Sequence, residues 1–364
     1  MSEPLPDEGW SRRIVIVRDA LVCPPAGPGY FQKCGILGPD GDCLHGANWR
    51  EGERLTMAVT RRPKPARRLS GRHLWGGMYY GHFGHFLTET LSRLWGLKGS
   101  GAESVLFLPK HGALPGFSGY RADACRLFGV DVPVSVVDQP IEVEELIVPG
   151  QGFGLGKISR GTPEFRAMLR ELSHRITAQG PERIYISRTR FGGKGGIIDE
   201  AALERNMVAQ GYSVIYPEKM PLEKQLAHYK AATHVVGLDS SAFHVFGFVA
   251  RPDQRAAIIL RRNAHAWQHI AWQLEAVMEQ PPLVIQALLA DWLPERQNSA
   301  NHLSWGELDF RAVAGKLAEG GFISDPSFWE LADETGFATA VAAAEQVNRG
   351  PLIRCPAPEF IQAH

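Results

Sequence analysis

The chain has 364 residues, more than one hydrophobic core usually serves, so we expect two domains. Its 44% hydrophobic and 21% charged content is typical of a folded globular protein and excludes general disorder. Because 39 basic residues balance 39 acidic ones, no overall positive field attracts nucleic acid, and we expect no nucleic-acid partner.

The cysteines indicate a reducing compartment. Their number, five, is odd, and no C-x-x-C pair occurs, which argues against a disulfide framework and a structural zinc site. The N-terminal residues lack the apolar core of a signal peptide, and the longest apolar runs are too short to span a bilayer. We therefore expect a cytoplasmic protein and leave open a peripheral contact with the inner face of the cell membrane.

The first half of the chain mixes strand-like runs with loops. Residues 23–48 are rich in Gly and Pro and predict irregular structure, and the glycine-rich residues 151–161 look like a linker. Thr162, followed by Pro163, is typical of a helix start, and this helix would run to about residue 178 and lead into a second domain. The predicted strands are 14–17, 104–108, 134–138 and 146–148, and the earlier helices 85–98 and 120–128.

The second half alternates regularly between short β-rich runs and helices. The predicted strands are 183–187, 213–216, 234–237 and 256–260, and the helices between them 199–210, 222–231 and 241–250. This alternation predicts a parallel sheet covered on both faces. Ligands bind beyond the carboxyl ends of such strands, so the loops after Ser187 and Gly237 are the places to expect them. From residue 265 onward the chain is predicted to be mainly helical.

The helix predicted over residues 85–98 carries a candidate base. His85 and Glu89 are four residues apart, so their side chains can meet on one face. A carboxylate beside an imidazole orients the ring and raises its proton affinity, which suits a general base that deprotonates a hydroxyl group. The alternative is a solvated helix face, which would also hold Ser92 and Arg93.

A basic, glycine-rich loop follows the strand predicted to end at Ser187. It contains Arg188, Arg190 and Lys194 together with glycines at 192, 193, 195 and 196. Positive charge and close approach of the backbone are what a diphosphate requires. The alternative is a mobile basic surface loop.

The turn after Gly237 leads from a strand into a helix. Free backbone amides there, with the hydroxyls of Ser240 and Ser241, could hold a phosphate. The alternative is that Asp239 or Ser240 only caps the helix and that His244 is a packed core residue.

Between Glu53 and Glu89 the chain has no carboxylate. The seven basic residues of this stretch are Arg54, Arg61, Arg62, Lys64, Arg67, Arg68 and Arg72. They could meet an anionic acceptor or a membrane surface. The alternative is a solvated loop that contains Pro63 and Pro65.

Three blocks resemble, in the same order, motifs of the family 61 glycosyltransferases of bacterial polysaccharide synthesis. They are GHFLTETLSRLW from Gly84, RIYISRTR from Arg183, and the long block from Gly211 to Ala250. The resemblance implies a GT-B-like α/β fold with two Rossmann-like domains facing a cleft. It implies inverting, metal-independent transfer from a nucleotide-sugar donor to an oligosaccharide, polysaccharide or lipid-linked saccharide acceptor.

The resemblance also implies roles for individual residues. Arg188 would bind the donor diphosphate, assisted by Arg190, Lys194, Ser240, Ser241 and His244. His85 or Glu89 would be the base, with Asp239 as the second candidate, and His82 and Arg93 would lie on the acceptor side. No metal site and no cofactor are expected. Asp239 and Ser240 replace the His-Gly that is commoner in the family, and Val245 replaces a frequent asparagine, so the donor stays open.

The expected domains are an acceptor-side α/β domain over 1–160, a nucleotide-sugar-binding Rossmann-like domain over 161–285, and a helical extension over 286–364. A nucleotide-sugar oxidoreductase or epimerase is one alternative. It should show G-x-G-x-x-G after its first strand, where this chain has Cys23-Pro24-Pro25. A non-catalytic sugar-binding or assembly subunit on the same fold is the other alternative.

Overall fold

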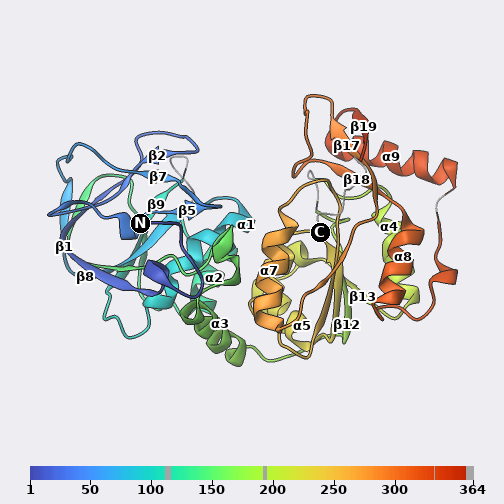
Figure 1. Ribbon diagram of the computed structural model, residues 1–364, viewed down its shortest axis with the longest axis horizontal. Helices are drawn as coiled ribbons and strands as arrows, with labels where there is room; N and C mark the ends of the chain where they lie inside the picture. Colours follow the sequence, from blue (N-terminus) through green and yellow to red (C-terminus); the bar gives the residue numbers. More distant parts are fainter. Residues whose placement is uncertain (111–115, 192–194, 332, 358–364) are drawn as a thin grey trace. The chain divides into compact units, whose positions relative to one another are not determined.

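A computed structural model of the chain describes residues 1–110, 116–191, 195–331 and 333–357. The chain forms two compact units (Figure 1). Unit 1 consists of Met1–Ile176 with Gly247–Val249, and unit 2 of Thr177–Phe246 with Ala250–His364. In the described ranges, no helix has the length and apolar character needed to cross a membrane.

Unit 1 is built on a mixed seven-stranded sheet of order β10-β9-β8-β11-β1-β3-β4. Strands β8 to β11 pair in parallel, whereas β1, β3 and β4 are antiparallel to their neighbours. The strands are β1 (Ile14–Cys23), β3 (Gly35–Gly38), β4 (Gly41–Asp42), β8 (Arg67–Tyr79), β9 (Ser104–Pro109), β10 (Val134–Val136) and β11 (Ile141–Pro149). Two small pairs lie outside this sheet: β2 (Gln32–Lys33) with β7 (Thr56–Met57), and β5 (Trp49–Arg50) with β6 (Glu53–Arg54).

Three of the seven basic residues of the acid-free stretch are paired with carboxylates, two of them on strand β8. Arg68 pairs with Asp19 at 2.6 Å and also with Glu142. Arg72 pairs with Glu145, and Arg54 pairs with Asp42 at 2.7 Å. The partner carboxylates come from β1, β4 and β11, which are distant in sequence, so a count of local charges could not reveal them.

The helix predicted over 85–98 consists of three short pieces, and its polar face is buried. The pieces are α1 (Phe83–His85), the π-helical η3 (Phe86–Thr90) and the 3-10 helix η4 (Leu91–Gly96). Glu89, Ser92 and Arg93 are all buried, so the alternative of a solvated face is wrong. The other helices of unit 1 are η1 (Gly9–Arg12), η2 (Leu44–Gly46), α2 (Tyr120–Leu127), η5 (Lys157–Arg160) and α3 (Pro163–Arg175).

Helix α3 begins as predicted but belongs to unit 1. The Thr162 side chain accepts a hydrogen bond from the Phe165 amide at 3.2 Å and caps the helix. Phe165 stacks on Phe153 with ring centroids 4.7 Å apart, which fixes α3 against the segment before it. The units therefore divide after Ile176, whereas the sequence predicted a boundary after residue 160.

Unit 2 contains a five-stranded parallel sheet of order β13-β12-β14-β15-β16. Its strands are β12 (Arg183–Ile186), β13 (Ser213–Ile215), β14 (His234–Leu238), β15 (Arg255–Ile259) and β16 (Leu283–Ile285). The chain runs outward from β12 to β13 and then returns to β14 on the other side of β12. The strand order thus reverses between β12 and β14, and ligands of doubly wound sheets bind beyond the carboxyl ends at such a point.

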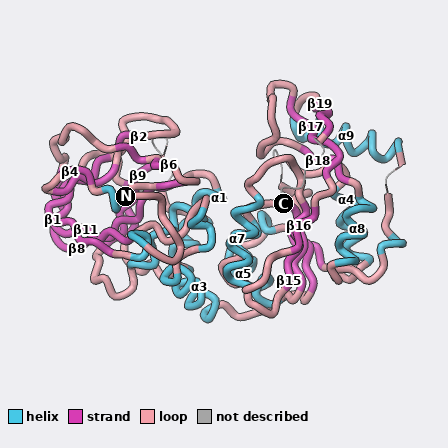
Figure 2. Tube along the Cα trace, viewed as in Figure 1, coloured by secondary structure: helices cyan, strands magenta, loops and turns pink. Residues whose placement is uncertain are grey.

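Helices cover both faces of this sheet, as predicted (Figures 1 and 2). Helices α4 (Glu200–Ala209) and α8 (Phe310–Glu319) lie on one face, and Leu203, Val313 and Leu317 pack with the strands in one core. The other face carries α5 (Leu222–Ala231) and α7 (Trp267–Met278) (Figure 1), and α6 (Ala242–Phe246) contacts both of them. The short helix η6 (Pro217–Lys219) precedes α5 in the chain.

The C-terminal region was expected to be a mainly helical extension, and this is wrong in two respects. It contains an antiparallel sheet of β17 (Leu288–Pro294), β18 (Trp305–Leu308) and β19 (Leu352–Pro356), besides η7 (Pro326–Phe328) and α9 (Glu334–Asn348). It is also grouped with unit 2, because α8 supplies part of the unit 2 core and Ile197 forms a β-bridge with Gly306.

Candidate functional site

In unit 1, the carboxylate of Glu89 is fully buried and surrounded by donors. Arg50 donates from Nε to Oε1 at 3.1 Å and from Nη2 to Oε2 at 2.8 Å. His85 Nδ1 lies 2.7 Å from Oε2, and Asn48 Nδ2 donates to Oε1 at 3.4 Å. This paired Arg–carboxylate geometry is among the strongest of charged contacts in proteins.

The protonation state of Glu89 follows from these partners. Burial alone would raise its pKa, but the hydrogen bond with His85 and the charge of Arg50 outweigh burial and leave the pKa below its usual value. Glu89 is therefore ionised at neutral pH, and an ionised carboxylate can only accept hydrogen bonds. The proton between the two residues accordingly sits on His85 Nδ1.

His85 is the member of this cluster that a ligand can reach, with 34% of its side chain exposed. When Nδ1 carries the proton of a neutral ring, Nε2 has a free lone pair. Within the described ranges, Nε2 makes no hydrogen bond with the protein. The His82 ring, which is exposed, lies 5.4 Å away and the Tyr80 ring 5.6 Å away. An oriented imidazole backed by a buried carboxylate has the geometry of a general base.

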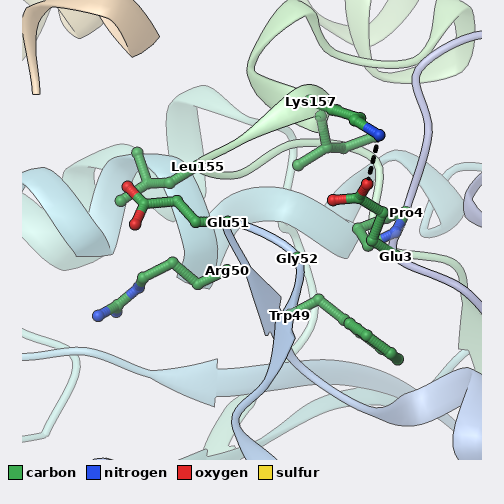
Figure 3. A pocket seen from close by; sticks show the side chains of 9 residues that line it. Glu3, Pro4, Trp49, Arg50, Glu51, Gly52, Leu155 and Lys157 are labelled. Atoms are coloured by element: carbon green, nitrogen blue, oxygen red, sulfur yellow. Dashed lines mark ion pairs between the residues drawn. The ribbon is translucent and has the colours of Figure 1, made fainter. Parts of the chain in front are cut away.

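Arg50 comes from the two-residue strand β5 and is held between aromatic rings. Its guanidinium carbon lies 5.8 Å from the Tyr30 centroid and 5.3 Å from that of Tyr80. Beside β5, the Arg50 side chain points away from the ion pair of Glu3 and Lys157 (Figure 3). Sequence analysis missed Arg50, because no local pattern shows that a residue in an irregular region would meet Glu89.

Arg93 was expected on the acceptor side, but the structure gives it an internal place. It is 1% exposed and donates to the carbonyls of Ala47 at 2.7 Å, His45 at 3.3 Å and Pro149. Burial lowers its pKa to about 9. Arg93 therefore ties together backbone segments beneath the cluster and has no exposed surface for an acceptor.

In unit 2, charged residues gather where β12, β14 and β15 end. Arg188 follows β12, Asp239 follows β14, and Arg261 and Arg262 follow β15. The Arg188 amide donates to Glu200 Oε1 at 2.8 Å, and its Nη2 donates to the Gly195 carbonyl at 2.9 Å. Arg188 therefore lies at the carboxyl end of β12, beside the switch point of the sheet.

Asp239 organises the two arginines after β15. Its Oδ1 accepts the Arg261 amide at 2.8 Å, and its carbonyl accepts Arg261 Nε at 3.1 Å. Arg262 Nε lies 3.5 Å from Oδ2. Since Asp239 is 3% exposed, it is placed to hold arginines and not to receive a proton from an acceptor. Sequence analysis missed Arg261 and Arg262, although two arginines directly after a predicted parallel strand are a usable signal.

Glu200 is a second missed carboxyl group, in the first turn of α4. It accepts hydrogen bonds from the Arg188 amide and from the Tyr185 hydroxyl at 3.1 Å. Burial raises its pKa to about 7. Burial likewise lowers the pKa of Arg188, and that of Arg261 to about 9. The site therefore holds charged groups that are costly to bury in the absence of compensating partners.

The remaining basic residues of the predicted donor loop are less well placed. Arg190 is exposed, and its guanidinium carbon lies 4.1 Å from the Tyr216 ring centroid. Lys194 lies outside the described residues.

The predicted phosphate-binding helix start is only partly supported. Helix α6 has five residues, Ala242–Phe246, instead of spanning 241–250, so its dipole is small. Ser240 is buried and Ser241 half-buried just before it. His244 is buried, with Nδ1 2.6 Å from Gln273 Oε1 on α7, as expected for a packed core residue.

Comparison with known proteins gives one family. The family model described as Glycosyltransferase 61 matches residues 83–257, and no curated protein matches the chain. The matched region includes His85, Glu89, Arg188 and Asp239. Arg50 precedes it, and Arg261 and Arg262 follow it. Among the residues that the structure describes, no group of three His, Cys, Asp or Glu side chains is arranged to hold a metal ion.

Proposed function

We propose that the chain, whose residues 83–257 match the model of glycosyltransferase family 61, is an inverting enzyme that transfers a sugar from a nucleotide-sugar donor to a saccharide acceptor in polysaccharide biosynthesis. The proposal includes a GT-B-like fold and transfer without a metal ion. The observation that carries it is the half-buried His85, whose Nδ1 is fixed by the buried Glu89 and whose Nε2 has no hydrogen-bond partner among the residues that the structure describes.

The proposed reaction is a single displacement. His85 Nε2 takes the proton of an acceptor hydroxyl while the hydroxyl oxygen forms a bond to the anomeric carbon of the donor sugar. The bond from that carbon to the diphosphate oxygen breaks, and the nucleoside diphosphate leaves with the electron pair. Glu89 stabilises the imidazolium that forms, and attack opposite the leaving group inverts the anomeric configuration.

Burial supports His85 over the other two candidate bases. Glu89 is fully buried with both oxygens occupied, and Asp239 is committed to Arg261 and Arg262. In this mechanism, Glu89 orients the base and Asp239 orients the arginines that follow β15.

The direct test is release of free nucleotide from a panel of nucleotide sugars, with and without saccharide acceptors. We expect one donor to be consumed, at the same rate in the presence of a metal chelator. We expect His85→Gln to slow transfer by about 10²–10⁴-fold, as removal of a general base typically does. The control is His174→Gln, which changes an exposed histidine of α3.

Two results would contradict the proposal. One is full transfer activity in His85→Gln. The other is binding of nucleotide sugars with no release of nucleotide under any condition, which would favour the non-catalytic sugar-binding subunit.

A further inference from the structure

Two aromatic side chains lie on the surface of unit 1, directly before strand β2. Tyr30 and Phe31 are 45% and 52% exposed, and their rings pack edge to face with centroids 4.9 Å apart. Met57, on the strand β7 that pairs with β2, is 43% exposed. Large apolar side chains that gather on a surface mark a binding site, whereas single ones do not.

The backbone that carries the aromatic pair is held by buried side chains. Lys110 is buried and donates from Nζ to the carbonyls of Gly29 at 2.8 Å and Tyr30 at 2.5 Å. Gln32 is also buried, and its side-chain amide donates to the Gly27 carbonyl at 2.8 Å. Aromatic rings on a fixed backbone lose little conformational freedom when a ligand binds, which lowers the cost of association.

The Tyr30 ring is connected to the candidate base by a row of contacts within unit 1. The Arg50 guanidinium carbon lies 5.8 Å from the Tyr30 centroid and 5.3 Å from that of Tyr80. The Tyr80 ring in turn lies 5.6 Å from the ring of His85, and Arg50 is the ion-pair partner of Glu89. An oligosaccharide of several residues can therefore contact the aromatic pair while one of its hydroxyls reaches His85.

The charged groups beside Tyr30 favour a neutral ligand. The Tyr30 hydroxyl donates to Glu53 Oε2 at 3.2 Å. Burial raises the pKa of Tyr30, and the carboxylates of Glu53 and Glu51 raise this pKa further. The positive charge of Arg50 is already paired with Glu89. Carboxylates accept hydrogen bonds from the hydroxyls of a sugar and repel the carboxylate of a sugar acid.

We infer that Tyr30 and Phe31 bind a sugar ring of a neutral oligosaccharide acceptor. One face of a pyranose ring presents mainly C–H groups, which pack on an aromatic ring, while the hydroxyls at its edge can reach a carboxylate such as that of Glu53. This surface precedes residues 83–257, which the family model matches. The inference rests on the proposed function in taking the bound saccharide as the acceptor, but binding itself requires no transfer.

The experiment is a calorimetric titration of the full-length protein, without donor, with cellotetraose, xylotetraose, mannotetraose and maltotetraose. We expect saturable binding of at least one of them, and a dissociation constant about tenfold higher for Phe31→Ala because an aromatic contact is lost. Phe31→Tyr keeps the ring and should retain the affinity. Ile16→Ala is the matched control, because Ile16 lies on β1 of the same unit and is 51% exposed. Thermal unfolding checks that each variant is folded.

Four results would overturn the inference. They are no binding of any of the four neutral tetrasaccharides, unchanged affinity in Phe31→Ala, an equal loss in Phe31→Tyr, and tighter binding of tetragalacturonic acid than of the neutral sugars.

Failure of this surface and failure of the proposed function can be told apart. Saccharide binding that Phe31→Ala weakens, without consumption of any nucleotide sugar, would support the surface and contradict the function. Transfer by Phe31→Ala with an unchanged KM for the acceptor would do the reverse.

Discussion

The charged clusters of the two units differ in how completely they are satisfied. In unit 1, the Glu89 carboxylate accepts hydrogen bonds from Arg50, His85 and Asn48, and His85 Nε2 has no hydrogen-bond partner in the described chain. In unit 2, Arg188, Arg261 and Arg262 each retain a buried nitrogen without an acceptor in the described chain. In the first cluster the charge of the carboxylate is balanced within the protein, and His85 Nε2 can accept a proton. In the second cluster the guanidinium groups outnumber the carboxylates that pair with them, which favours binding of an anion.

The largest expected effect tests whether the buried side chains of Arg50 and Glu89 in unit 1 depend on each other. Glu89→Ala would leave Arg50 buried without its carboxylate, so we expect the free energy of unfolding to fall by about 3–5 kcal/mol. Urea denaturation measures this, and Glu89→Gln, which keeps one acceptor oxygen, should lose less. A loss below about 1 kcal/mol for Glu89→Ala would contradict the idea that the two side chains depend on each other.

The next effect is a pH dependence that arises in unit 2. The pKa of Glu200 is about 7 in the folded protein, against 4.5 for an unperturbed glutamate. Below pH 4.5 the group is protonated in both the folded and the unfolded states. As the pH rises to 7, the unfolded chain ionises first, so the folded state loses on the order of 3 kcal/mol.

Denaturation at pH 5 and at pH 8 checks this sign. The difference in the free energy of unfolding between the two values should be smaller in Glu200→Gln than in the unaltered protein. An equal difference in both proteins would show that Glu200 does not titrate in this range.

A smaller effect concerns the close packing beside the arginines. Gly195→Ala places a Cβ against the Ser304 carbonyl, and overpacking of this kind costs about 1–3 kcal/mol. Because the Gly195 carbonyl accepts a hydrogen bond from Arg188 Nη2, we expect weaker pyrophosphate binding in a calorimetric titration as well as lower stability. Gly350→Ala is the control, because a Cβ there meets nothing within 4 Å. Unchanged affinity in Gly195→Ala would separate the glycine from the site.

The smallest effect is expected in the basic stretch of unit 1. Arg68 is half-exposed and pairs with Asp19 and Glu142, so Arg68→Ala should change the free energy of unfolding by less than about 1 kcal/mol. The same denaturation assay measures it. A loss comparable to that of Glu89→Ala would mean that exposed ion pairs contribute as much as the buried cluster does.

The sequence was most informative where local patterns suffice. The alternation of strands and helices in unit 2 was predicted, and helix α5 has the predicted bounds, because hydrophobic period and end signals are local. Strand β8 was missed, since its first half is basic and its second half contains consecutive glycines. The C-terminal strands were missed because they pair across long intervening segments, as Leu293 of β17 does with Ile353 of β19.

The residues of the candidate site also divide into those that a local pattern reveals and those that only the fold brings together. His85 and Glu89 were predicted to meet because they are four residues apart, and they do. Arg50 lies 39 residues from Glu89, and only the folded chain brings them together. Arg261 and Arg262 were within reach of sequence reasoning, since they directly follow a predicted strand, but their relation to Asp239 and Arg188 depends on strand order.

The most direct test of the account compares His85→Gln and Arg262→Gln in one transfer assay with the same donor. If unit 1 supplies the proton acceptor and unit 2 binds the diphosphate, the two substitutions should change different kinetic parameters. His85→Gln should lower kcat and leave the KM for the donor unchanged, whereas Arg262→Gln should raise that KM. If His85→Gln retained its kcat, or if both variants changed only the donor KM, this division of roles would be wrong.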